Sequence, residues 1–132
     1  MKPERLEEIK QANQARTPGK WLWFGYKANR DVALRTYLPG GGGAWEVLSF
    51  RRWGMRGAQP VFYDWVERML RSATELFIFS KEDTCTPIIT DINNPDARFI
   101  AKAPEYVTEL LELVDEQAAR IKELESGIEV PN

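Results

Sequence analysis

The last third of the chain carries the pattern that most constrains its fold. Residues 93–96 (Asn-Asn-Pro-Asp) have the chemistry of a helix start, because asparagine caps free amides, proline fits the first turn and an acid favours the positive helix end. Apolar residues then recur at helical spacing as far as Leu124, and Gly127 offers a stop. Since proline disfavours helical geometry at the preceding residue, we predict that Pro104 starts a second, longer helix at an angle to the first.

The apolar seam of the long helix approximates a heptad repeat. Its members are Val107, Leu110 or Leu111, Val114, Ala118, Ile121 and Leu124. The other positions are largely acidic and indicate a solvated face. A seam of about three heptads is marginal alone, so the helix is expected to pack on a sheet, on a partner subunit, or on both.

The residues ahead of these helices predict mainly β structure. Pro3 to Arg16 has the spacing of a short amphipathic helix, which Thr-Pro-Gly at 17–19 ends. Lys20 to Tyr26 is an aromatic strand with apolar groups on both faces, which predicts burial on both. It forms a hairpin with 32–38. Further strands are predicted at 45–53, 61–65, 74–80 and 87–92, while 66–73 stays ambiguous between helix and strand.

These elements predict one α+β domain spanning residues 1–132. It has a short N-terminal helix, an antiparallel sheet of about five to six strands and two C-terminal helices, the last one long. Residues 17–92 form the mainly β part, and residues 94–126 form a helical part that is the expected oligomer interface. A chain of this length buries one core.

Residue counts exclude several kinds of chemistry. The chain has no histidine and one cysteine, Cys85, so zinc sites, histidine-based triads and an internal disulfide are excluded. The acid pairs Asp64 with Glu67 and Glu82 with Asp83 are typical of a charged surface. We predict no catalytic residue, no metal and no cofactor. No apolar run approaches the ~20 residues of a membrane span, so a cytoplasmic location is expected.

Charge is divided unevenly along the chain. Residues 1–60 hold eleven Lys and Arg against five Asp and Glu, whereas residues 61–132 hold seven against fifteen. The basic front half suits an anion site, and the acidic back half argues against binding along duplex nucleic acid. An anion site here is expected to be a pocket.

Phe50 to Pro60 concentrates the candidate ligand-binding residues. Arg51, Arg52, Trp53 and Arg56 suit a planar anion, because guanidinium groups fork onto phosphate oxygens and an indole offers a flat apolar face. Composition alone favours the alternative, a solvated strand end whose tryptophan packs in the core. Strand alternation would place Arg51 and Arg52 on opposite faces.

Four stretches of the chain resemble a group of small phage-encoded proteins. They are Ala-x-Thr-Pro-Gly-x-Trp at 15–21, Arg-Trp-Gly through Gly-Ala-Gln-Pro at 52–60, Asp-Ala-x-Phe-Ile-Ala at 96–101, and the leucine-rich helix at 107–124. Within that group the chain is most similar to the first Thoeris anti-defence family, phage proteins that capture the nucleotide signal of bacterial TIR immune enzymes.

The resemblance implies a function and a site. It implies sequestration, without turnover, of a cyclic ADP-ribose isomer and in some members of cyclic oligonucleotides, by an assembly of dimers in the host cytoplasm. It also implies that Arg52 and Phe77 contact the adenine. Relatives often carry Arg-Thr-Asp where this chain has Pro-Glu-Tyr at 104–106, which leaves Arg98 or Lys102 to supply the missing cation. Two alternatives stay open: a protein that blocks a host defence enzyme through its acidic helix, and a carboxylate-dependent enzyme that degrades the signal.

Overall fold

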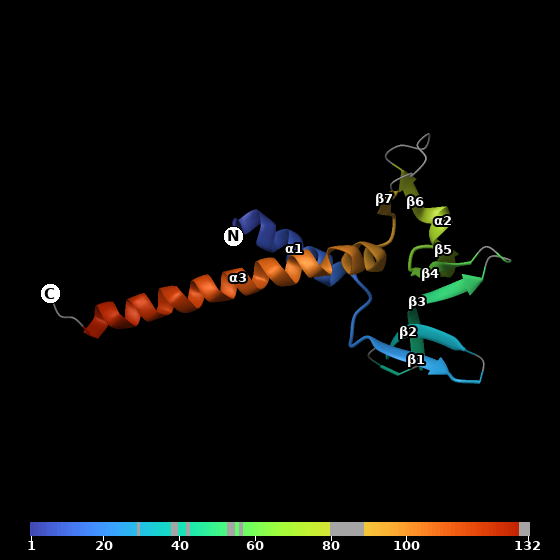
Figure 1. The fold of residues 1–132 in the computed structure, drawn as a ribbon, viewed down its shortest axis with the longest axis horizontal. Helices are drawn as coiled ribbons and strands as arrows, with labels where there is room; N and C mark the ends of the chain where they lie inside the picture. The colour runs from blue at the N-terminus through green and yellow to red at the C-terminus, as the bar shows by residue number, and fades with distance from the viewer. Residues whose placement is uncertain are drawn as a thin grey trace.

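The computed structural model describes residues 1–28, 30–37, 40–41, 43–52, 55, 57–79 and 89–129. A five-stranded sheet lies at one end of the molecule, and a long helix runs away from it with a shorter helix beside its first part (Figure 1). The helices are α1 (Pro3–Ala15), α2 (Ala73–Leu76) and α3 (Pro95–Glu129). The strands are β1 (Leu22–Tyr26), β2 (Asp31–Tyr37), β3 (Ala44–Arg52), β4 (Ala58–Asp64), β5 (Met69–Ser72), β6 (Phe77–Phe79) and β7 (Ile89–Ile92).

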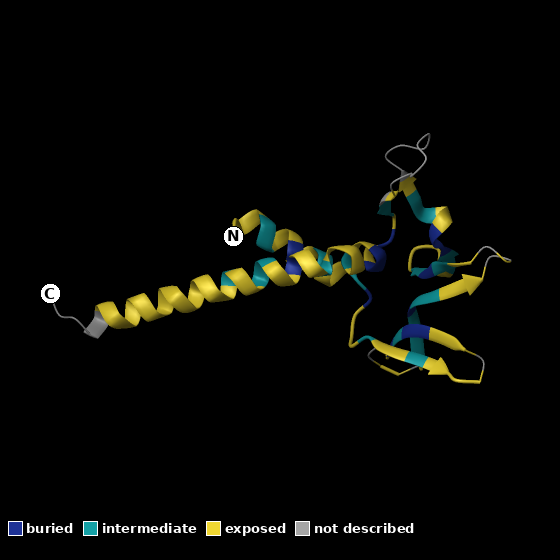
Figure 2. Cartoon of the chain, in the orientation of Figure 1, coloured by how far each residue is buried: buried dark blue, intermediate teal, exposed yellow. Residues whose placement is uncertain are grey.

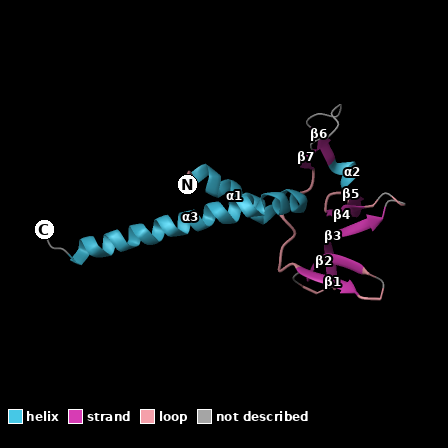
Figure 3. Cartoon of the chain, in the orientation of Figure 1, coloured by secondary structure: helices cyan, strands magenta, loops and turns pink. Residues whose placement is uncertain are grey.

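The strands form two antiparallel sheets in the described part of the chain. Strands β1 to β5 pair in sequence order, and β6 pairs with β7 (Figure 3). The core cluster is Phe62, Ala73 and Ala97, from β4, α2 and α3, with Phe77 among the side chains packed against it. The start of α3 is therefore tied to the sheet. The α+β class predicted from the sequence is confirmed.

The first strand differs from its prediction. β1 lies at the edge of the sheet and pairs with β2, so the predicted hairpin is correct. Trp23 is 65% exposed and Tyr26 66% exposed. Burial on both faces was the wrong expectation, because an edge strand with two apolar faces needs covering layers that this fold does not place over β1.

The stretch predicted as a strand over 74–80 begins as helix. α2 covers residues 73–76, and strand geometry begins only at Phe77. Gln59 of β4 explains the change, because its Oε1 accepts hydrogen bonds from the backbone N of Thr74 at 3.1 Å and from the Thr74 hydroxyl at 2.9 Å. Because Gln59 and Thr74 are 15 residues apart, the residue pattern of 74–80 alone does not predict this contact.

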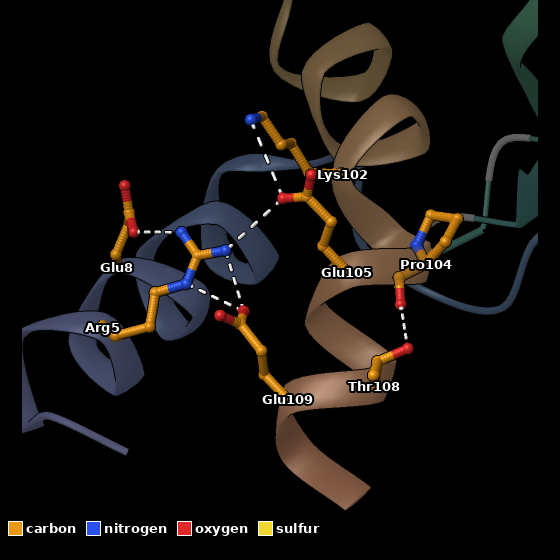
Figure 4. A network of polar contacts seen from close by, with 7 residues as sticks. All are labelled: Arg5, Glu8, Lys102, Pro104, Glu105, Thr108 and Glu109. Carbon is orange, nitrogen blue, oxygen red and sulfur yellow. Dashed lines mark hydrogen bonds and ion pairs between the residues drawn. The ribbon is translucent and has the colours of Figure 1, made fainter. Parts of the chain in front are cut away.

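The C-terminal helix is one helix, not two. α3 continues through Pro104 and past Gly127, so the break predicted at the proline is wrong. Pro104 is exposed, as is Ile100, whose carbonyl loses its helical donor, so water can replace the missing bond. The Thr108 hydroxyl also donates to the Pro104 carbonyl at 2.9 Å (Figure 4).

α1 supports α3 in the turns that follow that proline. The Arg5 guanidinium lies 2.8 Å from Glu109 and 3.5 Å from Glu105 (Figure 4). The Arg5 guanidinium also lies over the Tyr106 ring, 5.3 Å from its centroid, and Tyr106 is buried. The Met1 amino group reaches Glu116 at 3.7 Å. α1 therefore covers one side of α3 only as far as about residue 116.

Candidate functional site

The largest hollow of the described surface is a groove of about 960 Å³ where α1, β4, α2 and α3 meet. Its volume is at the upper end of the 300–1,000 Å³ typical of small-molecule sites. Three of its side chains are arginines, Arg16, Arg71 and Arg98, and Trp65 supplies an indole. The acidic members are Asp64, Glu67 and Glu75. The groove is therefore mixed in charge, with cations from three separate elements.

A buried polar contact fixes the elements around this groove. Thr17, just after α1, donates its backbone N–H to Asp96 Oδ1 at 2.5 Å and its hydroxyl to Asp96 Oδ2 at 2.6 Å. Trp65 donates its indole N–H to Thr17 Oγ1 at 3.1 Å. Thr17 and Asp96 are each 2% exposed. Burial raises the pKa of Asp96, and the two bonds from Thr17 oppose that shift.

Two sequence motifs meet in this contact. Thr17 belongs to the Thr-Pro-Gly stretch and Asp96 opens the Asp-Ala-x-Phe-Ile-Ala stretch, 79 residues later. Trp21 and Phe99 from the same two motifs also pack edge to face, with ring centroids 5.9 Å apart. Gly19 has a φ of +94°, and a side chain there would meet Thr36 Oγ1 at 2.6 Å. Contacts between the two motifs therefore fix the positions of the segments that line the groove.

Arg16 is held in place by neutral groups. Its guanidinium donates to Asn13 Oδ1 at 2.9 Å and to the Thr17 carbonyl at 2.8 Å. It also lies over the rings of Trp21 and Phe99, at 5.2 and 5.3 Å from their centroids. Arg16 makes no ion pair with a carboxylate of the described residues, so its positive charge is fixed in position without a direct acidic partner.

Arg71 of β5 is only partly satisfied. Its Nε lies 3.0 Å from Asp64 Oδ2, and its Nη1 lies 3.7 Å from Glu75 Oε2. The Nε–H nevertheless has no hydrogen-bond acceptor in the described part of the chain, because the Asp64 oxygen lies close by but outside hydrogen-bond geometry. A buried donor left unsatisfied is costly. The Nε atom itself is buried, so a ligand oxygen would have to contact the exposed part of the Arg71 side chain, which is 28% exposed overall.

Arg98 of α3 has the strongest protein partners of the three cations. Its guanidinium contacts both carboxylate oxygens of Asp91, the nearer at 2.7 Å, and Asn93 Oδ1 at 2.9 Å. The Arg98 charge lowers the pKa of Asp91, and Asp91 raises the pKa of Arg98. The side chain stays about half exposed and can accept a further anion.

Trp65 gives the groove its aromatic wall. It is 41% exposed, and its ring packs against Tyr63 and Trp45 with centroids 4.6 and 5.5 Å away. The indole N–H donates a hydrogen bond to Thr17 Oγ1, and this bond fixes the orientation of the ring. An anchored, partly exposed indole is suited to stack on a flat ring.

Of the predicted site residues that the structure describes, Arg98 and Lys102 lie together. Both line a smaller hollow of about 190 Å³ beside β7, and Arg98 also lines the groove. Lys102 lies 3.8 Å from Glu105. Arg51 and Arg52 end β3, where Arg51 contacts the Ser72 hydroxyl at 3.3 Å and Arg52 pairs with Ala58 in the strand ladder. Neither of these two arginines lines the groove.

The other three predicted site residues are one residue packed on the core and two that lie outside the described part of the chain. Phe77 is partly buried against the core cluster and is not a lining residue of the groove. Trp53 and Arg56 lie outside the described residues, as does Cys85. The sequence reasoning missed Arg16, Arg71 and Trp65, because three segments far apart in the chain bring them together.

Comparison of the chain with protein-family models, with curated protein sequences and with solved structures finds no match. Functional arguments therefore rest on the geometry of the groove. Within the described residues, no group of three or more Asp, Glu, His or Cys side chains could hold a metal ion. In the same part of the chain, no helix combines the length and apolar character that crossing a membrane requires.

Proposed function

We propose that the protein binds an adenine-containing cyclic nucleotide in the groove and sequesters it without cleaving it. The observation that carries the proposal is the meeting of three guanidinium groups and one indole in a hollow of nucleotide size. In the biological setting implied by the sequence resemblance, the ligand is a cyclic ADP-ribose isomer or a cyclic oligonucleotide. The protein would then be a phage anti-defence protein that removes a TIR-derived immune signal in the host cytoplasm.

Each part of such a ligand has a counterpart in the groove. Arg16, Arg71 and Arg98 can donate charge-assisted hydrogen bonds to a pyrophosphate. Trp65 can stack on the adenine. The carboxylates of Asp64 and Glu67 can accept hydrogen bonds from ribose hydroxyls. The mixed charge of the groove therefore fits a ligand that carries both phosphates and sugars.

Sequestration requires tight binding and slow release. Arg16 and Trp65 are already oriented by hydrogen bonds and aromatic neighbours, so binding would cost little side-chain ordering. Affinity among related complexes is set mainly by the dissociation rate, and fixed contacts slow dissociation. No nucleophile is needed for this activity.

The resemblance and the groove suggest different contact residues. The resemblance implies that Arg52 and Phe77 contact the adenine, whereas the groove implies Arg71, Arg98 and Trp65. Both versions describe the same ligand class. Binding measurements on Arg71→Gln and Arg52→Gln distinguish them, because both substitutions remove one guanidinium and keep a polar side chain.

A thermal-shift screen against ADP-ribose, cyclic ADP-ribose isomers and cyclic oligonucleotides tests the proposal. A ligand that binds only the native state raises the melting temperature. At a ligand concentration of 100 times its Kd, it adds about 2.7 kcal/mol to the free energy of unfolding. No shift with any of these ligands would overturn the proposal. The bound ligand is then released by heating and analysed by chromatography.

The released material separates binding from degradation. Intact ligand supports sequestration. Cleaved product would instead support an enzyme that uses the groove carboxylates Asp64, Glu67 and Glu75. That alternative has a structural basis because these acids share the groove with the arginines.

A second candidate function is blockade of a host defence enzyme by α3. The observation in its favour is the exposed outer half of this helix, where residues 114–127 carry four acidic and two basic side chains. Under this alternative, neutralising Glu112, Glu116 and Glu123 abolishes the anti-defence effect, and Arg71→Gln leaves it intact. Sequestration predicts the opposite pair of results.

A further inference from the structure

The outer half of α3 is largely uncovered within the described structure, although the Met1 amino group lies 3.7 Å from Glu116. Residues 114–127 are all exposed, and this part of the helix projects away from α1 and the sheet (Figure 2). α1 reaches along α3 only to about Glu116. An isolated helix of this length is marginal in water. The outer half is therefore expected to gain order from a further contact.

An apolar stripe follows one side of this helix. Its members, called the bare seam below, are Val107, Leu111, Val114, Ala118, Ile121 and Leu124. The five larger side chains are between 54% and 59% exposed. Spacings of three and four residues place them along one face, as in a coiled-coil seam. Glu125 stands where the next apolar residue would fall, so the seam ends there.

The charges beside the bare seam indicate what covers it. Asp115 and Lys122 each follow a seam residue directly, so they lie on the same edge of the seam, two turns apart. The other edge carries Leu110 and Gln117, which have no charge. In an antiparallel helix pair like edges face each other, whereas in a parallel pair unlike edges meet.

We propose that a second copy of this chain covers the bare seam, with the two α3 helices antiparallel. A two-fold axis between Ala118 and Ala119 places Asp115 of each copy beside Lys122 of the other, so the same ion pair forms twice. The two uncharged edges also meet. A parallel pair would instead place both charged residues against the uncharged edge. The small side chains at the axis allow the helices to approach closely.

This arrangement leaves the rest of the molecule free. Pairing Asp115 with Lys122 sets residue 108 opposite residue 129, and the start of α3 at Pro95 lies about 20 Å further along the axis. The partner helix therefore stops short of the groove. α1 occupies a different side of α3, where Tyr106 is buried while the adjacent Val107 is 54% exposed. The inference does not depend on the proposed nucleotide binding.

Analytical ultracentrifugation of the full chain over a range of concentrations tests the pairing. Wild type is expected to be a dimer, and Val114→Glu/Ile121→Glu is expected to weaken association at least about 100-fold by adding buried charges. Glu112→Gln/Glu123→Gln, away from the seam, is the matched control and should associate as wild type. Circular dichroism and melting curves show whether each variant remains folded.

Charge exchange tests the antiparallel orientation. Asp115→Lys and Lys122→Asp should each raise the dimer dissociation constant about fivefold, because two attractive pairs become repulsive. The double variant Asp115→Lys/Lys122→Asp should return to the wild-type value. A double variant no tighter than the single ones would overturn the antiparallel pair. A wild-type monomer at every concentration would overturn self-association and assign the seam to a different protein.

Discussion

The two ends of α3 differ sharply although one continuous helix forms both. At its start, Asp96 and Ala97 are buried against Thr17 and the sheet, whereas every residue from 114 to 127 is exposed. The sheet end is held by long-range polar and apolar contacts, whereas the outer end of the described helix has its own hydrogen bonds and the exposed ion pair of Glu116 with the Met1 amino group. Substitutions at the two ends should therefore act on different properties, folding at the start and association at the far end.

The largest expected effect is at Asp96. Asp96→Ala leaves the Thr17 N–H and hydroxyl without their acceptor in a buried site, so the free energy of unfolding should fall by about 3 kcal/mol. Asp115→Ala, on the exposed half, is the control and should change it by less than about 0.5 kcal/mol in the monomer. Urea denaturation measures both. Equal losses would contradict the contrast between the two ends.

Neighbouring residues give a second comparison across the width of the helix. Tyr106→Ala removes a ring that is 8% exposed and that contacts Arg5, so a loss of about 2–3 kcal/mol is expected. Val107→Ala should cost less than about 0.5 kcal/mol under monomeric conditions, since Val107 is 54% exposed. The dimer dissociation constant should show the opposite pattern, with a larger increase for Val107→Ala than for Tyr106→Ala. A large folding effect at Val107 would show that the seam is covered within one chain.

The pH dependence of stability should be modest and assigned to the buried acid. Burial raises the pKa of Asp96 above its ordinary value of 3.8, so between 3.8 and the raised pKa the folded chain binds more protons than the unfolded chain. Stability contributed by this group therefore falls as pH rises through that window. Wild type should therefore lose stability relative to Asp96→Asn as the pH rises above about 3.8. A relative gain would contradict the sign of the shift.

Much of the fold was predictable from local pattern. Asn94 caps α3 as predicted, because its Oδ1 accepts hydrogen bonds from the backbone N of Asp96 and Ala97. The first helix and the β1–β2 hairpin also lie where periodicity placed them. The errors came where tertiary contacts override local preference. Pro104 is tolerated because the carbonyl that loses its donor belongs to an exposed residue, and because Arg5 of α1 contacts Glu105 and Glu109 in the turns after it.

The groove was beyond sequence reasoning for a related reason. Its cations come from the residue that follows α1, from β5 and from α3, and no local spacing connects Arg16, Arg71 and Arg98. The Thr17–Asp96 contact spans 79 residues, and each partner alone fits a more common role, as a turn residue or a helix-start acid. Arg98 was predicted as a replacement for the arginine that relatives often carry at 104–106, but its neighbours in the groove required the fold.

Isothermal titration with a cyclic ADP-ribose isomer most directly tests whether the groove binds nucleotide. Wild type should bind the ligand, and Arg71→Gln should raise the Kd roughly 10-fold to 100-fold through loss of a charge-assisted contact. Arg52→Gln, at the end of β3, should bind as wild type. Binding that survives Arg71→Gln and is lost in Arg52→Gln would contradict the groove as the site.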